Sequence, residues 1–92
     1  MDKLTNILTT SDLAIGYKNG KARKILTEGL NLKITKGKFI ALLGANGVGK
    51  STLIRTLANL QSSLHGQVFL KGKAIDKYQP KEFARILSLV LT

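Results

Sequence analysis

The feature that most limits the fold of this chain is a glycine-rich loop between two apolar segments. Residues 44–52 read GANGVGKST and satisfy the pattern G-x-x-x-x-G-K-[ST]. The loop follows FIALL at residues 39–43, an uninterrupted apolar run typical of a buried parallel strand. After the loop, apolar residues recur at helical spacing, at Leu53, Ile54, Leu57 and Leu60. A strand, a glycine loop and a helix in this order predict a loop that binds a nucleoside triphosphate; a flexible linker is the weaker alternative.

The residue types in the loop suit a triphosphate and Mg²⁺. Gly47 and Gly49 lack a β-carbon, so the backbone can turn its amides toward the phosphates, and the helix start adds further amide donors. We expect Lys50 to reach the β- and γ-phosphates, Ser51 to place its hydroxyl on Mg²⁺, and Thr52 to face the α-phosphate. The predicted phosphate-binding residues are Gly44, Ala45, Asn46, Gly47, Val48, Gly49, Lys50, Ser51 and Thr52.

The charge of the chain is strongly positive. The chain has fifteen Lys and Arg and five Asp and Glu, which gives a formal net charge of +10. Its 92 residues are enough for one small domain. The basic residues are spread out and few aromatic residues lie among them, which favours a solvated basic surface over a nucleic-acid groove. We therefore expect no direct nucleic-acid partner. No carboxylate occurs between Glu28 and Asp76, so the loop lies in a segment suited to an anion.

The segment before the loop, about residues 10–38, has the pattern of short strands and turns. Residues 13–15 predict a strand that ends at Gly16, and the Asn19-Gly20 pair predicts a hairpin turn. Apolar and polar residues alternate over residues 30–35, which indicates a half-buried strand.

The region 39–60 is expected to hold the strand, loop and helix, and the region 61–92 a further strand, a helix and the next strand. Residues 67–70 predict the first of these strands, with a turn at residues 71–73. Pro80 suits the first position of a helix, and Glu82 lies in that first turn. The apolar run at residues 87–91 predicts another buried strand.

This order of residues resembles the ATP-binding cassette (ABC) ATPases of transporters over about residues 13–91. The loop at 44–52, its lead-in ITKGKFIALLG at 34–44, HGQVFLKG at 65–72 and ARILS at 84–88 carry the resemblance. It implies an α/β P-loop fold and the N-terminal part of the cassette, with a small antiparallel β subdomain and the start of the parallel core sheet. It also implies ATP and Mg²⁺ as ligands. An aromatic residue after the first strand stacks on adenine in this family, and Tyr17 stands there; the alternative is that Tyr17 merely covers a hairpin.

The chain departs from the family pattern in its hydrolytic part. The family's glutamine aligns with Thr92, so that glutamine is either altered or lies past the end. No two glycines are adjacent, as the signature loop requires, and no carboxylate follows an apolar run. We therefore expect a truncated cassette without catalytic residues, which binds ATP and is inactive alone.

The resemblance implies the ATPase subunit of an importer, with iron–siderophore complexes, haem or cobalamin as possible cargo. Its expected partners are a transmembrane permease and a second copy of the subunit, at the cytoplasmic face of the membrane. Two alternatives remain open: a soluble ABC-type ATPase that acts on ribosomes or DNA, and a non-catalytic ATP-binding fragment.

Overall fold

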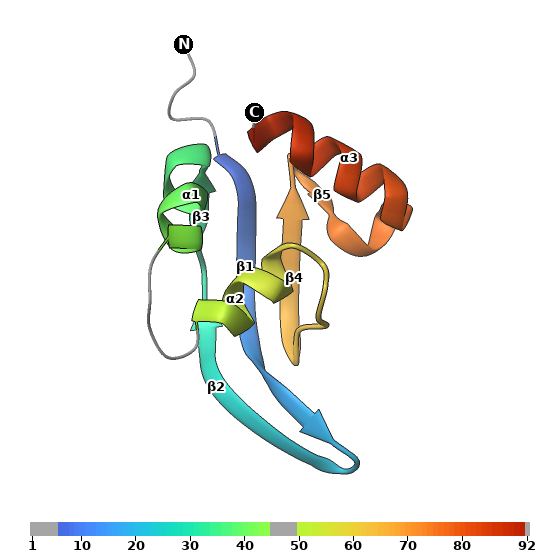
Figure 1. Cartoon of the computed structure of the whole chain (residues 1–92). Coiled ribbons are helices and arrows are strands. Elements are labelled where there is room, and N and C mark those ends of the chain that lie inside the picture. Colours follow the sequence, from blue (N-terminus) through green and yellow to red (C-terminus); the bar gives the residue numbers. More distant parts are fainter. Residues whose placement is uncertain (1–5, 45–49, 92) are drawn as a thin grey trace.

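The computed structural model describes residues 6–44 and 50–91 (Figure 1). The elements in chain order are β1 (Asn6–Asn19), β2 (Ala22–Leu30), β3 (Lys33–Thr35), α1 (Lys36–Gly44), α2 (Lys50–Leu57), β4 (His65–Leu70), β5 (Lys73–Ala74), the short 3₁₀ helix η1 (Ile75–Lys77) and α3 (Pro80–Leu91). The strands form one sheet in the order β2-β1-β4-β5, and β3 pairs with the first part of β1. Every pairing between the described strands is antiparallel.

The long strand β1 keeps one face toward the core although its register shifts in the middle. Leu8 and Thr10 are buried in its first half, and Leu13 and Ile15 in its second half. Between them Asp12 adopts φ 48°, where the pairing with β4 is irregular. Side chains alternate along a strand, so one extra residue changes which positions face the core. The bulge thus lets two apolar segments of opposite phase serve one core.

The predicted hairpin between β1 and β2 is confirmed, but its first strand is longer than expected. Asn19 pairs with Ala22 around Gly20, which has φ 64°. Gly16 does not end the strand, because β1 continues through it. A β-carbon on Gly16 would lie 2.0 Å from the carbonyl oxygen of Lys24. Glycine is therefore required here for the close approach of the two strands, and not as a strand terminator.

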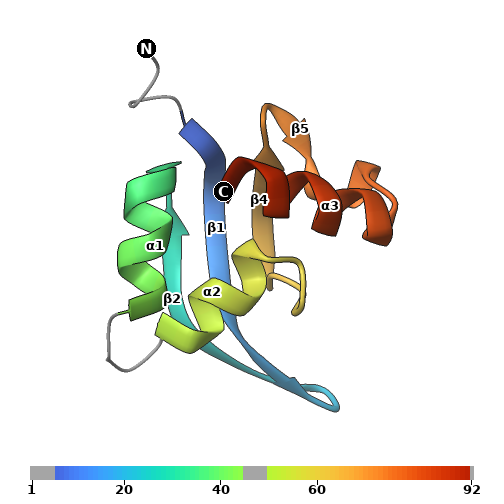
Figure 2. The same cartoon turned by 45° about the horizontal axis from the view of Figure 1, so that its top comes forward.

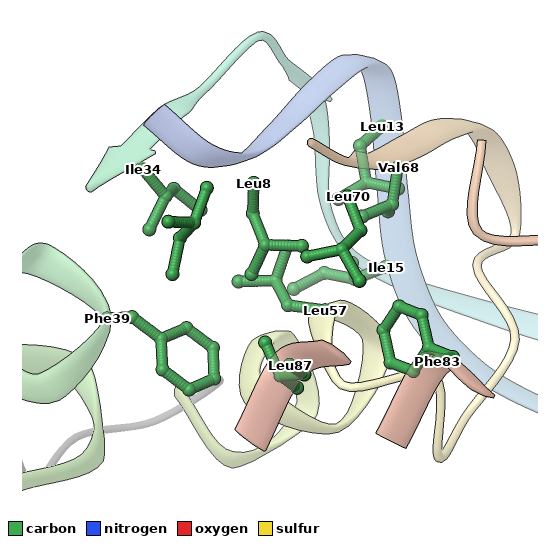
Figure 3. Close-up of a cluster of buried hydrophobic side chains, with 11 residues drawn as sticks. Leu8, Leu13, Ile15, Ile34, Phe39, Leu57, Val68, Leu70, Phe83 and Leu87 are labelled. Carbon is green, nitrogen blue, oxygen red and sulfur yellow. The ribbon is translucent and has the colours of Figure 1, made fainter. Parts of the chain in front are cut away.

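The core lies between the sheet and three helices that cover one of its faces (Figure 2). Phe39 of α1, Leu57 of α2, and Phe83 and Leu87 of α3 are each at most 9% exposed. They meet apolar side chains of the strands, which are Ile7, Leu8, Leu13, Ile15, Ile34, Val68 and Leu70 (Figure 3). Burial of this cluster is the main favourable contribution to folding.

The run at residues 39–43, predicted as a parallel strand, lies instead in helix α1. Thr35 precedes the helix, and its Oγ1 accepts a hydrogen bond from the amide of Lys38 at 3.3 Å, as an N-cap does. A short apolar run fits a strand or a helix equally well. Here β1 is already paired on both edges, and every pairing between the described strands is antiparallel. The helix satisfies the backbone locally and still buries Phe39.

Helix α2 ends earlier than the apolar spacing predicts. Asn59 adopts φ 62°. The amide of Leu60 donates to the carbonyl oxygen of Arg55 at 2.8 Å, and the amide of Asn59 donates to the carbonyl oxygen of Thr56 at 3.2 Å. This pair of bonds is the Schellman motif of a helix C-terminus. Leu60, expected on the core face, is consequently 77% exposed.

For the last part of the chain, the predicted helix is confirmed and the predicted final strand is wrong. Pro80 begins α3, and Glu82 lies in its first turn, as predicted. The helix does not stop before residue 87 but continues to Leu91. Phe83 and Leu87 lie one turn apart on its buried side, so the apolar run continues the helical period instead of starting a strand. The strand at 67–70 and its turn are confirmed as β4 and the link to β5.

Candidate functional site

The described residues of the predicted phosphate loop lie at the ends of two helices. Gly44 is the exposed last residue of α1, and Lys50 is the first residue of α2. Five of the predicted residues lie outside the described part of the chain: Ala45, Asn46, Gly47, Val48 and Gly49.

The first turn of α2 presents three side chains in three different environments. Lys50 is half-buried and lines a cavity of about 700 Å³, together with residues of β3 and α1. Ser51 is exposed to solvent, whereas Thr52 is only 1% exposed. The ammonium and the serine hydroxyl are therefore accessible to a ligand, and the threonine is held within the protein.

Tyr17 of β1 contacts this same turn. Its hydroxyl oxygen lies 2.6 Å from Oγ1 of Thr52, a hydrogen bond across 35 residues in which either group can donate. Tyr17 as a whole residue is 45% exposed. The structure thus brings together Tyr17 and Thr52, which the sequence assigns to the adenine and to the α-phosphate of one nucleotide.

The electrostatics of the turn favour an anion. No carboxylate occurs from residue 29 to residue 75, and within the described residues none lies within ion-pair distance of Lys50. The first amides of α2 have no partner within the helix and carry partial positive charge. The donor set therefore fits phosphate oxygens. Ser51 can supply one oxygen to Mg²⁺, which accepts its other ligands from phosphate and water.

Sequence reasoning missed two polar residues beside Tyr17. Arg55 lies on α2, and Gln61 follows the Schellman turn; both are half-buried. Each forms a side-chain hydrogen bond within this region. No motif marks them, because their contact with β1 depends on where α2 ends.

The family model described as ABC transporter matches residues 27–91. The chain is 40% identical over 85 residues to the iron(3+)-hydroxamate import ATP-binding protein FhuC of Bacillus subtilis, covering 92% of this chain and 30% of that protein. It is 41% identical over 83 residues to the ferric enterobactin transport ATP-binding protein FepC of Escherichia coli, covering 90% and 29%. The chain thus spans about 30% of the length of these curated relatives.

A solved structure with a similar fold is that of cbiO1 from Clostridium perfringens, described as part of the ABC transporter complex cbiONQ. It superposes with a TM-score of 0.61 at 26% identity, covering 90% of this chain and 32% of the other. Within the described residues, no helix is both long and apolar enough to cross a bilayer. Sequence and fold agree, and the chain belongs to the ABC transporter family, as the N-terminal part of its ATP-binding protein.

Proposed function

We propose that this chain binds ATP with Mg²⁺ through residues 44–52 and stacks the adenine on Tyr17. The observation that carries the proposal is the 2.6 Å contact between the hydroxyls of Tyr17 and Thr52. That contact fixes the aromatic ring beside the helix that begins at Lys50. A nucleotide whose phosphates meet Lys50 and Ser51 can then reach Tyr17 with its base.

The roles of the individual groups follow from their chemistry. The Lys50 ammonium neutralises phosphate charge, and the free amides of α2 donate to phosphate oxygens. The exposed Ser51 hydroxyl is available to the Mg²⁺ that accompanies the nucleotide. Tyr17 is 45% exposed, and its aromatic ring is suited to stacking on a purine.

The proposal assigns nucleotide binding, and no hydrolysis, to these 92 residues. None of the five acidic residues follows an apolar run, the position at which a carboxylate would hold Mg²⁺ or activate water in this family. We expect the chain alone to turn over no ATP above the uncatalysed background.

In the transporter, we propose that this part of the protein belongs to the ATPase subunit of an importer. FhuC is named for the import of iron(3+)-hydroxamate and FepC for the transport of ferric enterobactin, which favours an iron–siderophore cargo. The proposed partners are membrane permease subunits and a second ATPase copy that closes on ATP, at the cytoplasmic face of the membrane.

The test is calorimetric titration of the chain with Mg-ATP and, separately, with inorganic tripolyphosphate. We expect Lys50→Ala to raise both dissociation constants by about 10- to 100-fold, since hydrogen bonds to charged groups are worth about 1.5–3 kcal/mol. Lys81→Ala is the matched control, because Lys81 is an exposed lysine in the first turn of α3. Equal loss in both variants, or no binding by the unmodified chain, contradicts the proposal.

A further inference from the structure

A continuous set of side-chain hydrogen bonds connects Tyr17 to the end of α2. Gln61 Nε2 donates to the carbonyl oxygen of Gly16 at 2.6 Å, and Arg55 Nε donates to Gln61 Oε1 at 3.1 Å. Nη2 of Arg55 lies 3.5 Å from the hydroxyl oxygens of both Tyr17 and Thr52. Gln61 therefore holds the backbone beside Tyr17, and Arg55, which is bonded to Gln61, lies beside the Tyr17 hydroxyl. We call Arg55 and Gln61 the Tyr17 brace.

The brace does not use the arginine charge in an ion pair. Within the described residues, the partners of the Arg55 side chain are an amide oxygen and two hydroxyl oxygens, all uncharged. Arginine is suited to such a role because its planar group directs several N–H donors in fixed directions. The arginine thus orients uncharged groups around one aromatic side chain.

Tyr17 lies in an exposed part of the hairpin. The residue is 45% exposed, and its neighbours along the hairpin, Lys18, Asn19 and Gly20, are exposed as well. The strand fixes the backbone of Tyr17, and the hydroxyl contacts fix the opposite end of the ring. A ring held at both ends loses less conformational freedom when a base stacks on it.

We propose that Arg55 and Gln61 are positioning residues that hold the Tyr17 ring in the orientation that receives the nucleobase. This inference rests on the proposed function, in which Tyr17 stacks on adenine. Within the described residues, neither side chain bonds Lys50 or Ser51; Arg55 lies near Thr52, whose buried hydroxyl is engaged with Tyr17. Their contribution therefore falls on the affinity for the base and not on the affinity for the triphosphate.

The test compares Mg-ATP with inorganic tripolyphosphate in variants of the brace. Arg55→Lys keeps the charge and removes the directed donors, with Arg85→Lys on the exposed side of α3 as its control. We expect Arg55→Lys to raise the dissociation constant of ATP about five- to tenfold, part of the worth of one base stack, and to leave that of tripolyphosphate within about twofold. Equal changes for the two ligands, or no change for either, overturn the inference.

A double-mutant cycle separates positioning from a general structural effect. Tyr17→Phe keeps the ring and removes the hydroxyl that the brace holds. We expect the double variant of Tyr17→Phe and Arg55→Lys to bind ATP no more weakly than the weaker single variant, because both changes remove the same restraint. If the two losses in ATP affinity multiply in the double variant, the positioning role is contradicted.

A second measurement needs no nucleotide. Aromatic ¹³C relaxation of the unliganded chain reports the motion of both tyrosine rings, and Tyr78 serves as the internal control. We expect Arg55→Lys and Gln61→Met to increase the fast motion of the Tyr17 ring only. An unchanged Tyr17 ring overturns the inference. If the Tyr17 ring is restrained but the unmodified chain binds neither ligand, the proposed function is rejected and the positioning role is not.

Discussion

The hydroxyl of Tyr78 donates to the carbonyl oxygen of Leu70 at 2.7 Å and so ties the segment before α3 to the end of β4. The Tyr78 ring also meets that of Phe83 edge-on, with centroids 5.8 Å apart, and Lys73 Nζ lies 4.5 Å above it. Polar and apolar contacts of one side chain therefore fix where α3 begins relative to the sheet.

Removal of this hydroxyl is expected to weaken the fold without changing its shape. Tyr78→Phe keeps the ring contacts and loses one hydrogen bond, so we expect a loss of about 1 kcal/mol in the free energy of unfolding. Urea denaturation followed by circular dichroism measures it. An unchanged unfolding midpoint would mean that the Leu70 carbonyl is equally well satisfied by water.

Gly16 is expected to tolerate no side chain. In Gly16→Ala the new β-carbon would meet the Lys24 carbonyl oxygen at 2.0 Å, and backbone cannot move aside as a side chain can. We expect a loss of about 1–3 kcal/mol in thermal or urea unfolding. Gly37→Ala is the control, because a β-carbon there meets nothing within 4 Å and lies in a helix, where alanine is favoured by about 0.5–1 kcal/mol.

Thr10 connects β1 to the end of β2 and the link that follows it. Its hydroxyl donates to the carbonyl of Leu30 and accepts from the amide of Leu32, each at 2.8 Å. Thr10→Val keeps the shape but removes both bonds, so we expect a loss of about 1–3 kcal/mol, measured by urea unfolding. Thr27→Val, at an exposed position of β2, should change stability by less than about 0.5 kcal/mol. Equal effects of the two changes would contradict this role of Thr10.

Because Asn59 has a left-handed conformation, we expect two substitutions of it to change stability in different directions. Asn59→Gly relieves the strain at φ 62°, and we expect it to be neutral or to stabilise the chain slightly. Asn59→Ala should destabilise it by about 1 kcal/mol, because a β-carbon is disfavoured in this conformation. Thermal unfolding of both variants measures the difference. A more stable alanine variant would show that α2 can extend past its present end.

The sequence predicts those parts of the fold that depend on local chemistry. The Asn19-Gly20 turn, the strand now seen as β4, and the helix start at Pro80 all follow from residues that favour one conformation, and all are confirmed. The strand predictions for the two apolar runs at 39–43 and 87–91 are wrong for the same reason. Apolar character alone does not distinguish strand from helix, and here Phe39 and Leu87 are buried from helices.

The candidate site divides in the same way. Lys50, Ser51 and Thr52 are identified by a motif, because phosphate chemistry demands those residue types at that spacing. Arg55 and Gln61 carry no such mark. Their role follows from the Schellman turn at Asn59, which returns the chain toward β1, and only the folded chain reveals that neighbour.

The position of β1 has a consequence for synthesis on the ribosome. This strand is made before β2, β3 and β4, with all of which it pairs, and its last partner ends at residue 70. During translation the hairpin can form early, while the other edge of β1 stays unpaired for some fifty residues of chain growth. At about 5–20 residues per second, that edge is exposed for a few seconds in every molecule made. The nascent chain is therefore most exposed to aggregation before β4 emerges, a window in which a chaperone that covers open strand edges would act.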